Sequence, residues 1–264
     1  MDERHVATFY DHVGNSYDQT LYFLACEPPY RTEITRLTAG RRFRRILDMG
    51  CGTGKQTVVL APLADEVVAV DLSGSSLEQA KARCAQAGVT NVRFLQESIV
   101  NVPLEAGSVD AIFSYGDVIS HVHDAFQAVF CEAARLLGPG GFLACEVDGK
   151  WELDMLLHNP EERRRARATR GAGHLRIWHD IPCKTFTDPE LRAVLHTAGL
   201  RVLSIRGVNI LHCLLPEPVL MGLPRDVGGA WRTASALLQA ADRAVGRLPW
   251  FYRLASTRLV VAGK

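Results

Sequence analysis

The sequence predicts an α/β fold: a doubly wound, mostly parallel sheet of seven strands with helices on both faces. Short β-branched runs alternate with longer helical patterns over residues 44–149, as in βαβ units. Three glycines follow the first run at alternate positions, which permits a tight turn from strand to helix. With 264 residues, the chain is long enough for one such domain with a full hydrophobic core.

The first strand ends in residues 46–54, which read Ile-Leu-Asp-Met-Gly-Cys-Gly-Thr-Gly. Glycines at 50, 52 and 54 let the backbone turn sharply and approach a ligand without Cβ obstruction. Apolar residues resume at 58–60, as expected of a helix that packs back on the sheet. Such a helix presents free N–H groups and the positive end of its dipole to an anionic ligand group.

Two phosphate-binding hypotheses fit this loop poorly. The dinucleotide pattern is G-x-G-x-x-G, whereas this loop reads G-x-G-x-G with Asp48 two residues ahead of the first glycine. A nucleotide phosphate loop has four residues between its glycines and then Lys-Ser or Lys-Thr. Here Gln56 follows Lys55, and Met49 stands where the first glycine would be.

The pattern Asp-x-Gly-x-Gly-x-Gly resembles the nucleotide loop of class I S-adenosylmethionine-dependent methyltransferases, which have a Rossmann-like seven-stranded fold. The resemblance implies that the acid and the glycines lie beside the methionine part of the cofactor. Residues 66–71 are predicted as the second strand, ending in Asp71, 17 residues after Gly54. A strand-end carboxylate there can accept both ribose hydroxyls of an adenosine. The alternative role for Asp71 is a helix N-cap, which the loop makes the weaker hypothesis.

The next elements follow the same pattern. Residues 75–88 are predicted as a helix with a Ser75/Glu78 capping box, and residues 92–95 as the third strand. Residues 97–103 resemble the adenine-binding segment of the family, although the family has Gly-Asp where this chain has Glu-Ser. The resemblance implies that Ser98 bonds the adenine amine and that Ile99 supplies its N–H and an apolar face.

The fourth strand is predicted at 109–114, followed by a polar loop at 115–123. Ligands of open α/β sheets bind at the carboxyl ends of strands, so the chemistry is expected in this loop. A helix over 124–137, the turn at 138–141 and a fifth strand over 142–147 follow. The Leu-Leu-x-Pro-Gly-Gly turn is another feature that resembles the family.

His121 is the candidate general base, and His123 is the second candidate. Two histidines at this spacing could also bind a metal, but no pattern supplies a third ligand, so no metal is expected. A magnesium site of the catechol type would need acids after the fourth and fifth strands. Asp117 and Asp148 stand near those places, but Gly149 replaces the usual asparagine.

Residues 1–40 are predicted as an N-terminal helical cap on the cofactor-binding core, 44–149. Aromatic residues recur over 5–24, with Tyr10 and Tyr17 seven residues apart on one helical face. Similar segments in small-molecule methyltransferases form a lid over the cofactor; packing on the core is an equal alternative. Residues 27–30, Glu-Pro-Pro-Tyr, are predicted as a turn because consecutive prolines break helices.

Beyond Asp148 the resemblance weakens, and two insertions, 150–186 and 212–255, are predicted to cover the substrate. The first holds an N-cap at Asn159 and a hairpin or lid over 174–186; the second follows a strand at 200–206. A helix over 187–199 capped by Thr187 and Glu190, a helix over 228–246 and a last strand at 257–262 complete a single domain over 1–264.

The charge balance, 30 Lys and Arg against 29 Asp and Glu, favours a small-molecule substrate over nucleic acid or a membrane. Seven dispersed cysteines, no two closer than fourteen residues, exclude C-x-x-C metal clusters and fit reduced thiols. The N-terminus has no apolar signal core, so a cytoplasmic location is expected. The oligomeric state is left open.

The sequence therefore predicts a methyltransferase that moves a methyl group from S-adenosylmethionine to N, O, C or S of a small molecule, leaving S-adenosylhomocysteine. The alternatives are a non-catalytic cofactor-binding sensor or partner subunit and, less well supported, an NAD-dependent oxidoreductase. His121 is the predicted catalytic residue. The predicted cofactor site comprises Tyr17, Asp48, Gly50, Cys51, Gly52, Gly54, Asp71, Leu72, Ser98, Ile99 and Ser114.

Overall fold

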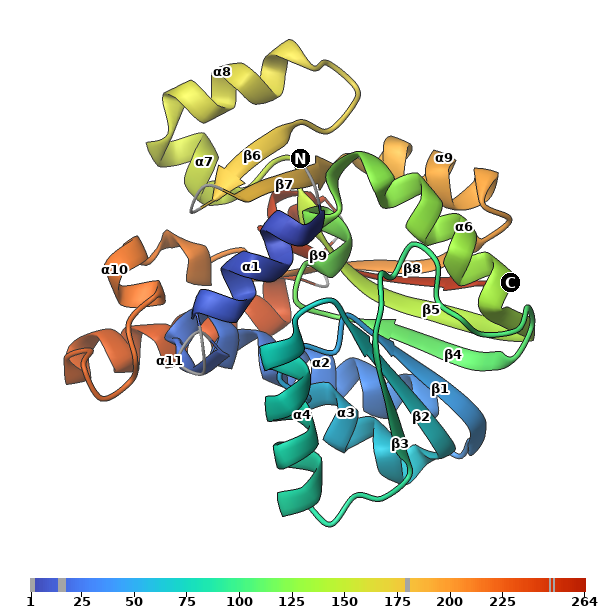
Figure 1. The fold of residues 1–264 in the computed structure, drawn as a ribbon. Coiled ribbons are helices and arrows are strands. Elements are labelled where there is room, and N and C mark those ends of the chain that lie inside the picture. Colours follow the sequence, from blue (N-terminus) through green and yellow to red (C-terminus); the bar gives the residue numbers. More distant parts are fainter. Residues whose placement is uncertain (1–2, 14–17, 179–180, 247, 249) are drawn as a thin grey trace.

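The computed structural model describes residues 3–13, 18–178, 181–246, 248 and 250–264 (Figure 1). Its centre is a parallel array in the order β3-β2-β1-β4-β5, with the topological switch between β1 and β4. The bounds are β1 Phe43–Met49, β2 Ala64–Asp71, β3 Val92–Gln96, β4 Val109–Ser114 and β5 Leu137–Gly149. Strand β9 (Thr257–Gly263) then runs antiparallel between β5 and β8 (Arg201–Val208). The predicted α/β class and mostly parallel sheet are confirmed.

The described sheet has nine strands instead of the seven predicted, because the first insertion adds a hairpin. Strand β5 extends beyond the end of β4, because the pairing of the two strands ends at Ser114↔Cys145. The last residues of β5 therefore have no partner on that edge from β4. Strand β7 (Ile181–Phe186) takes this edge in parallel, and β6 (Leu175–Trp178) pairs antiparallel with β7. The added strands satisfy backbone groups that would otherwise lack partners.

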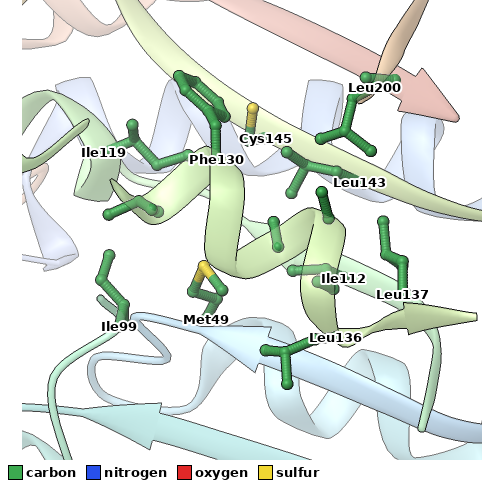
Figure 2. Packing of buried hydrophobic residues seen from close by; sticks show 14 of the residues in the cluster. Met49, Ile99, Ile112, Ile119, Phe130, Leu136, Leu137, Leu143, Cys145 and Leu200 are labelled. Atoms are coloured by element: carbon green, nitrogen blue, oxygen red, sulfur yellow. The ribbon is translucent and has the colours of Figure 1, made fainter. Parts of the chain in front are cut away.

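Helices cover both faces of the sheet. On one face lie α6 (Phe126–Leu136) and α9 (Asp188–Thr197), on the other α2 (Leu21–Thr38), α3 (Lys55–Leu60) and α4 (Gly74–Gln86). Figure 2 shows the first interface, where Phe130 of α6 packs with Met49, Ile112 and Leu143 from three strands. These side chains are fully buried, and the strands are mostly apolar, as is usual for parallel strands with two covered faces.

The predicted turn at 27–30 is wrong, because helix α2 continues through Pro28 and Pro29. The prolines remove two backbone donors, which costs helix stability. Tertiary packing outweighs that cost: Cys26, Tyr30 and Ile34 on either side are buried against the sheet. Burying such side chains is worth about 1.5–3 kcal/mol each for the large apolar ones.

Two of the predicted helix caps are confirmed and one is wrong. Thr187 and Glu190 form the predicted capping box of α9, and Asn159 Oδ1 accepts the N–H of Glu162 at the start of α8 (Pro160–Ala168). The predicted cap of α4 at Ser75 is wrong. Ser73 is the N-cap, and its hydroxyl accepts the N–H of Ser76 at 3.0 Å.

The remaining elements lie around the carboxyl ends of the strands (Figure 1), except the 3-10 turn at Ala61–Leu63, which leads into the start of β2. They are α1 (Glu3–Val13), α5 (Val118–His121), α7 (Leu153–His158), α10 (Glu217–Leu220), α11 (Gly229–Val245) and 3-10 turns at Ala61–Leu63, His123–Ala125, His212–Leu214 and Phe251–Leu254. Within the described ranges, none of the helices has the length and apolar character needed to span a lipid bilayer.

Candidate functional site

The loop after β1 is shaped by its three glycines. Gly50, Gly52 and Gly54 have φ angles of 75°, 50° and 80°, in the left-handed region that only glycine enters without strain. A Cβ on Gly50 would lie 2.4 Å from Val118, and one on Gly54 2.8 Å from the backbone of Ala80. A Cβ on Gly52 would meet nothing within 4 Å. Two glycines therefore serve close packing, and the third leaves space free.

That space belongs to a cavity of about 200 Å³ at the carboxyl ends of β1, β2 and β4. Seven of the predicted residues line it: Gly50, Cys51, Gly52, Asp71, Leu72, Ile99 and His121. Helix α1, in the predicted N-terminal cap, contributes Val6, Ala7 and Tyr10 to the wall of this cavity. In Figure 1, α1 crosses over these strand ends. We call this space the first cavity.

Asp71 holds the loop and still faces the first cavity. Its carboxylate accepts the N–H of Gly52 at 2.8 Å and the N–H of Ser73 at 2.9 Å, one on each oxygen. Burial raises the pKa of this carboxyl, while the two N–H donors lower it. Each carboxylate oxygen has a second lone pair. Asp71 can therefore accept two further hydroxyl groups without giving up its backbone bonds.

Four predicted site residues do not line the first cavity. Asp48 is buried beneath the loop, where it accepts the Thr57 hydroxyl at 2.6 Å, and burial raises its pKa to about 7. Gly54 packs against α4, as described above. Ser98 uses its hydroxyl to accept the N–H of Val100, and Ser114 is fully buried at the end of β4. Tyr17 lies outside the described residues.

The N-terminal segment is fastened to the glycine loop by polar contacts. Asp18 accepts the Thr53 hydroxyl at 2.8 Å and Arg83 at 3.2 Å. Lys55 pairs with Glu27 at 2.6 Å and donates to the carbonyl of Asp18. Further out, Asp11 of α1 accepts the hydroxyl of Ser73 at 2.5 Å. These bonds, which the sequence interpretation missed, join Asp11, Asp18 and Glu27 to the glycine loop and to α4.

A second cavity, of about 710 Å³, adjoins the first. The two share Phe23, Gly116 and His121 as lining residues. Most of the remaining wall comes from both insertions, 150–186 and 212–255. This volume lies within the range of about 300–1,000 Å³ that is usual for small-molecule sites.

His121 stands between the two cavities and is held from both sides. It is buried at the end of α5, with its Nε2 3.1 Å from the Tyr10 hydroxyl and its Nδ1 3.4 Å from Cys183 Sγ. Tyr10 comes from the cap and Cys183 from the hairpin β6–β7, so both added segments orient the imidazole. The side chain of His123 lies outside what the structure describes.

Glu146 is a buried acid that the sequence interpretation did not single out. Its Oε2 accepts the N–H of Gly116 at 2.9 Å and the hydroxyl of Tyr30. It thereby fixes the turn after β4 that borders both cavities. An acid within the otherwise apolar run of residues 142–147 was the signal that could have identified it.

No set of three His, Cys, Asp or Glu side chains that could hold a metal ion occurs in the described part of the chain. Asp117 and Asp148, the acids considered for magnesium, both line the second cavity.

Comparison with known proteins identifies the family of this chain. The methyltransferase domain family matches residues 46–141, which include the glycine loop and the first residues of β5, where the predicted turn at 138–141 is wrong because the chain is already a strand. A ubiquinone biosynthesis O-methyltransferase of Methylobacterium nodulans is 30% identical over 226 residues, covering 78% of this chain and 82% of that protein. For three other curated relatives, the chain spans only 24%, 57% and 59% of their lengths.

Solved structures show the same fold. A 1,6-didemethyltoxoflavin-N1-methyltransferase of Burkholderia thailandensis, crystallised with its substrate and S-adenosylhomocysteine, has a TM-score of 0.58 at 18% identity and covers 100% of this chain and 90% of that one. The [4+2]-cyclase SpnF has a TM-score of 0.61 at 18% identity, with 89% and 80% covered. At such identities the likeness concerns the fold. The chain, by its sequence relatives, its glycine loop and its strand order, belongs to the class I S-adenosylmethionine-dependent methyltransferases.

Proposed function

We propose that the protein transfers a methyl group from S-adenosylmethionine to a small-molecule acceptor. The observation that carries this proposal is the meeting of two cavities at His121: one beside the glycine loop and Asp71, the other within the insertions. A transferase needs two such spaces that open to each other, because donor and acceptor must react in line. A cofactor-binding sensor needs only the first.

The residues of the first cavity fit the cofactor. Gly52 and Gly116 line it, and a Cβ on either would project into open space rather than into protein. This is the expected form of a backbone cradle for a ligand. Asp71 retains free lone pairs for hydroxyl groups, and its position at the end of β2 is that of a ribose acceptor.

When bound, the cofactor supplies an electrophilic methyl group on a sulfonium. The chain contributes positioning and the exclusion of water. Helix α1 covers the first cavity, and Asp11, Asp18 and Lys55 hold this cover down. His121 is placed to accept a proton from an acceptor in the second cavity, once the imidazole is free of the Tyr10 hydroxyl.

The acceptor is a small molecule, since the insertions supply most of the wall of the second cavity and the charges of the chain are balanced. The named relatives include methyltransferases of quinone biosynthesis, which supports the same substrate size. The seven cysteines are all free thiols, which supports a reducing compartment such as the cytoplasm.

Calorimetry with S-adenosylmethionine, S-adenosylhomocysteine and NAD tests the cofactor. We expect both sulfur compounds to bind at one site per chain and NAD to give no heat. Mass spectrometry of a metabolite library, incubated with protein and isotopically labelled S-adenosylmethionine, then tests transfer. Binding without any labelled product would favour a sensor, and binding of NAD alone would contradict the proposal.

A further inference from the structure

The second cavity has one acidic wall and one apolar wall. Its acidic side chains are Asp117, Asp148, Glu152, Asp154 and Glu217. Its apolar wall comes from α2, the hairpin and the second insertion: Phe23, Ile177, Leu214, Leu215, Pro216, Leu220 and Met221. This division suits a ligand with an apolar body and one polar end.

Asp117 and Asp148 mark the end nearest the first cavity. Asp117 follows Gly116, which lines both cavities, and its φ of 58° holds it in a conformation that is unusual for an aspartate. Its Oδ1 is buried and finds no hydrogen-bond partner among the described residues. Asp148, at 8% exposed, is also buried against the cavity. A buried carboxylate oxygen without a partner is costly unless a ligand supplies one.

The basic side chains that line this cavity are engaged elsewhere on its wall. Arg176 pairs with Glu152 at 3.1 Å and lies 3.8 Å from Glu162. His158 lies 2.8 Å from Asp154 on the exposed rim. Within the described part of the wall, five acidic side chains therefore stand against Arg176 and the two histidines, His121 and His158. Such a field favours a cationic ligand over an anionic one.

We propose that the second cavity binds an acceptor carrying a basic amino group, with Asp117 and Asp148 as its carboxylate partners and the apolar wall around its body. This inference rests on the proposed function, because it assigns the acceptor side of the same site. Each carboxylate would accept an N–H from the ammonium group, in a charge-assisted hydrogen bond.

Protonation of the two acids should couple to this binding. Burial raises the pKa of Asp148 to about 7 and that of Asp117 well above its ordinary value, and the Asp148 carboxylate raises the pKa of Asp117 further. Glu146 and Glu152 act in the same direction, whereas Arg176 lowers both. An ammonium group would favour the ionised forms, so binding should release protons and strengthen as the pH rises through 7.

The test uses three probes with one shape: 2-(2-naphthyl)ethylamine, the matching alcohol 2-(2-naphthyl)ethanol, and the anion 2-naphthylacetate. Each is titrated by calorimetry into full-length protein saturated with S-adenosylhomocysteine, which excludes the probes from the first cavity. The series is repeated with phenyl and indolyl rings in place of naphthyl, so that a ring that fits the cavity poorly does not decide the result. Buffers of different ionisation enthalpy report the protons released.

We expect the amine to bind at least about tenfold more tightly than the alcohol, as one charge-assisted bond implies. The substitutions Asp117→Asn and Asp148→Asn should each lower the ratio of amine affinity to alcohol affinity about tenfold. Each should also reduce the number of protons released on binding. Both variants should fold, because asparagine has the shape of the protonated acid. Asp226→Asn, an exposed aspartate beside Arg225, removes the same charge outside the cavity and should change nothing.

Equal binding of amine and alcohol across all three rings would overturn the inference, as would an amine preference that survives both substitutions. Tighter binding of the acetate would instead make Arg176 the recognition residue. The proposed function fails separately: protein that does not bind S-adenosylhomocysteine, yet still prefers amines, refutes the cofactor and leaves the amine site in place.

Discussion

The first cavity is lined by the glycine loop, the end of β2 and the turn after β4, whereas the second takes most of its wall from residues 148–221. On the cofactor side, the left-handed backbone at Gly50, Gly52 and Gly54 shapes the loop and Gly52 leaves the space open, so a short stretch of sequence specifies it. On the acceptor side, side chains from both insertions meet across long sequence separations. The two sides should therefore respond independently to substitution, except at His121, where they join.

The largest effect is expected at this junction. His121→Ala should lower turnover by about 10²–10⁴-fold for an acceptor that must lose a proton, the usual span for a lost general base. The acidic limb of the pH–rate profile should vanish with it, while cofactor affinity stays unchanged. His158→Ala, on the exposed rim, is the control. A variant that retains the wild-type rate and pH profile would reduce His121 to a lining residue.

Below the cofactor loop, Asp48 should make stability depend on pH. Its folded-state pKa of about 7 exceeds the ordinary value of 3.8, so the folded state binds the proton more tightly than the unfolded state. Stability should therefore fall as the pH rises from about 4 to 7, by up to about 4 kcal/mol in total. Asp48→Asn should remove this slope, as denaturant unfolding at several pH values would show. Parallel curves for the two proteins would contradict the assignment.

The cofactor side is next probed at Asp71. Loss of its charge weakens hydrogen bonds worth about 1.5–3 kcal/mol each, so Asp71→Asn should weaken S-adenosylhomocysteine binding by at least about tenfold. Amine binding in the second cavity should stay the same. Asp65→Asn, at the exposed start of β2, controls for the loss of charge. If affinity is unchanged, Asp71 only holds the backbone of Gly52 and Ser73.

The smallest effect is expected at the cap. Asp18→Asn weakens contacts with Thr53 and Arg83, and partly exposed ion pairs contribute only about 0.2–1 kcal/mol. Limited proteolysis of residues 5–24 should therefore accelerate less than about fivefold, and saturating S-adenosylhomocysteine should suppress it. Cleavage that is equally fast with and without ligand would show that the segment does not cover a bound cofactor.

The same contrast explains how much the sequence could predict. Strands β1 to β4 and the glycine loop follow from local periodicity and spacing, so their positions agree with the structure within a few residues. The helix through Pro28 and Pro29 does not, because packing of Tyr30 and Ile34 outweighs a local preference for a turn. Similarly, the edge of β5 that recruits β7 becomes visible only when β4 and β5 are aligned.

For the candidate site, residues adjacent to the glycines could be predicted, and residues that act across the fold could not. Asp71 and His121 were identified by their places after strands. The contacts of Tyr10 and Cys183 with His121 join positions 111 and 62 residues away, and no sequence spacing indicates them. Asp117 and Asp148 are an intermediate case: the sequence places them after the fourth and near the end of the fifth strand, but the insertion residues that complete the wall of their cavity could not be predicted.

The central claim is that the cofactor occupies the space over Gly52, and one matched pair of variants tests it most directly. Gly52 and Gly88 both have left-handed φ angles, 50° and 68°, and a Cβ on either meets nothing within 4 Å. Only Gly52 lines the first cavity, whereas Gly88 follows the end of α4. Calorimetry with S-adenosylhomocysteine should show binding to Gly88→Leu as in the wild type and no detectable binding to Gly52→Leu, with similar unfolding temperatures for both variants. Equal affinities of the two variants would contradict the claim.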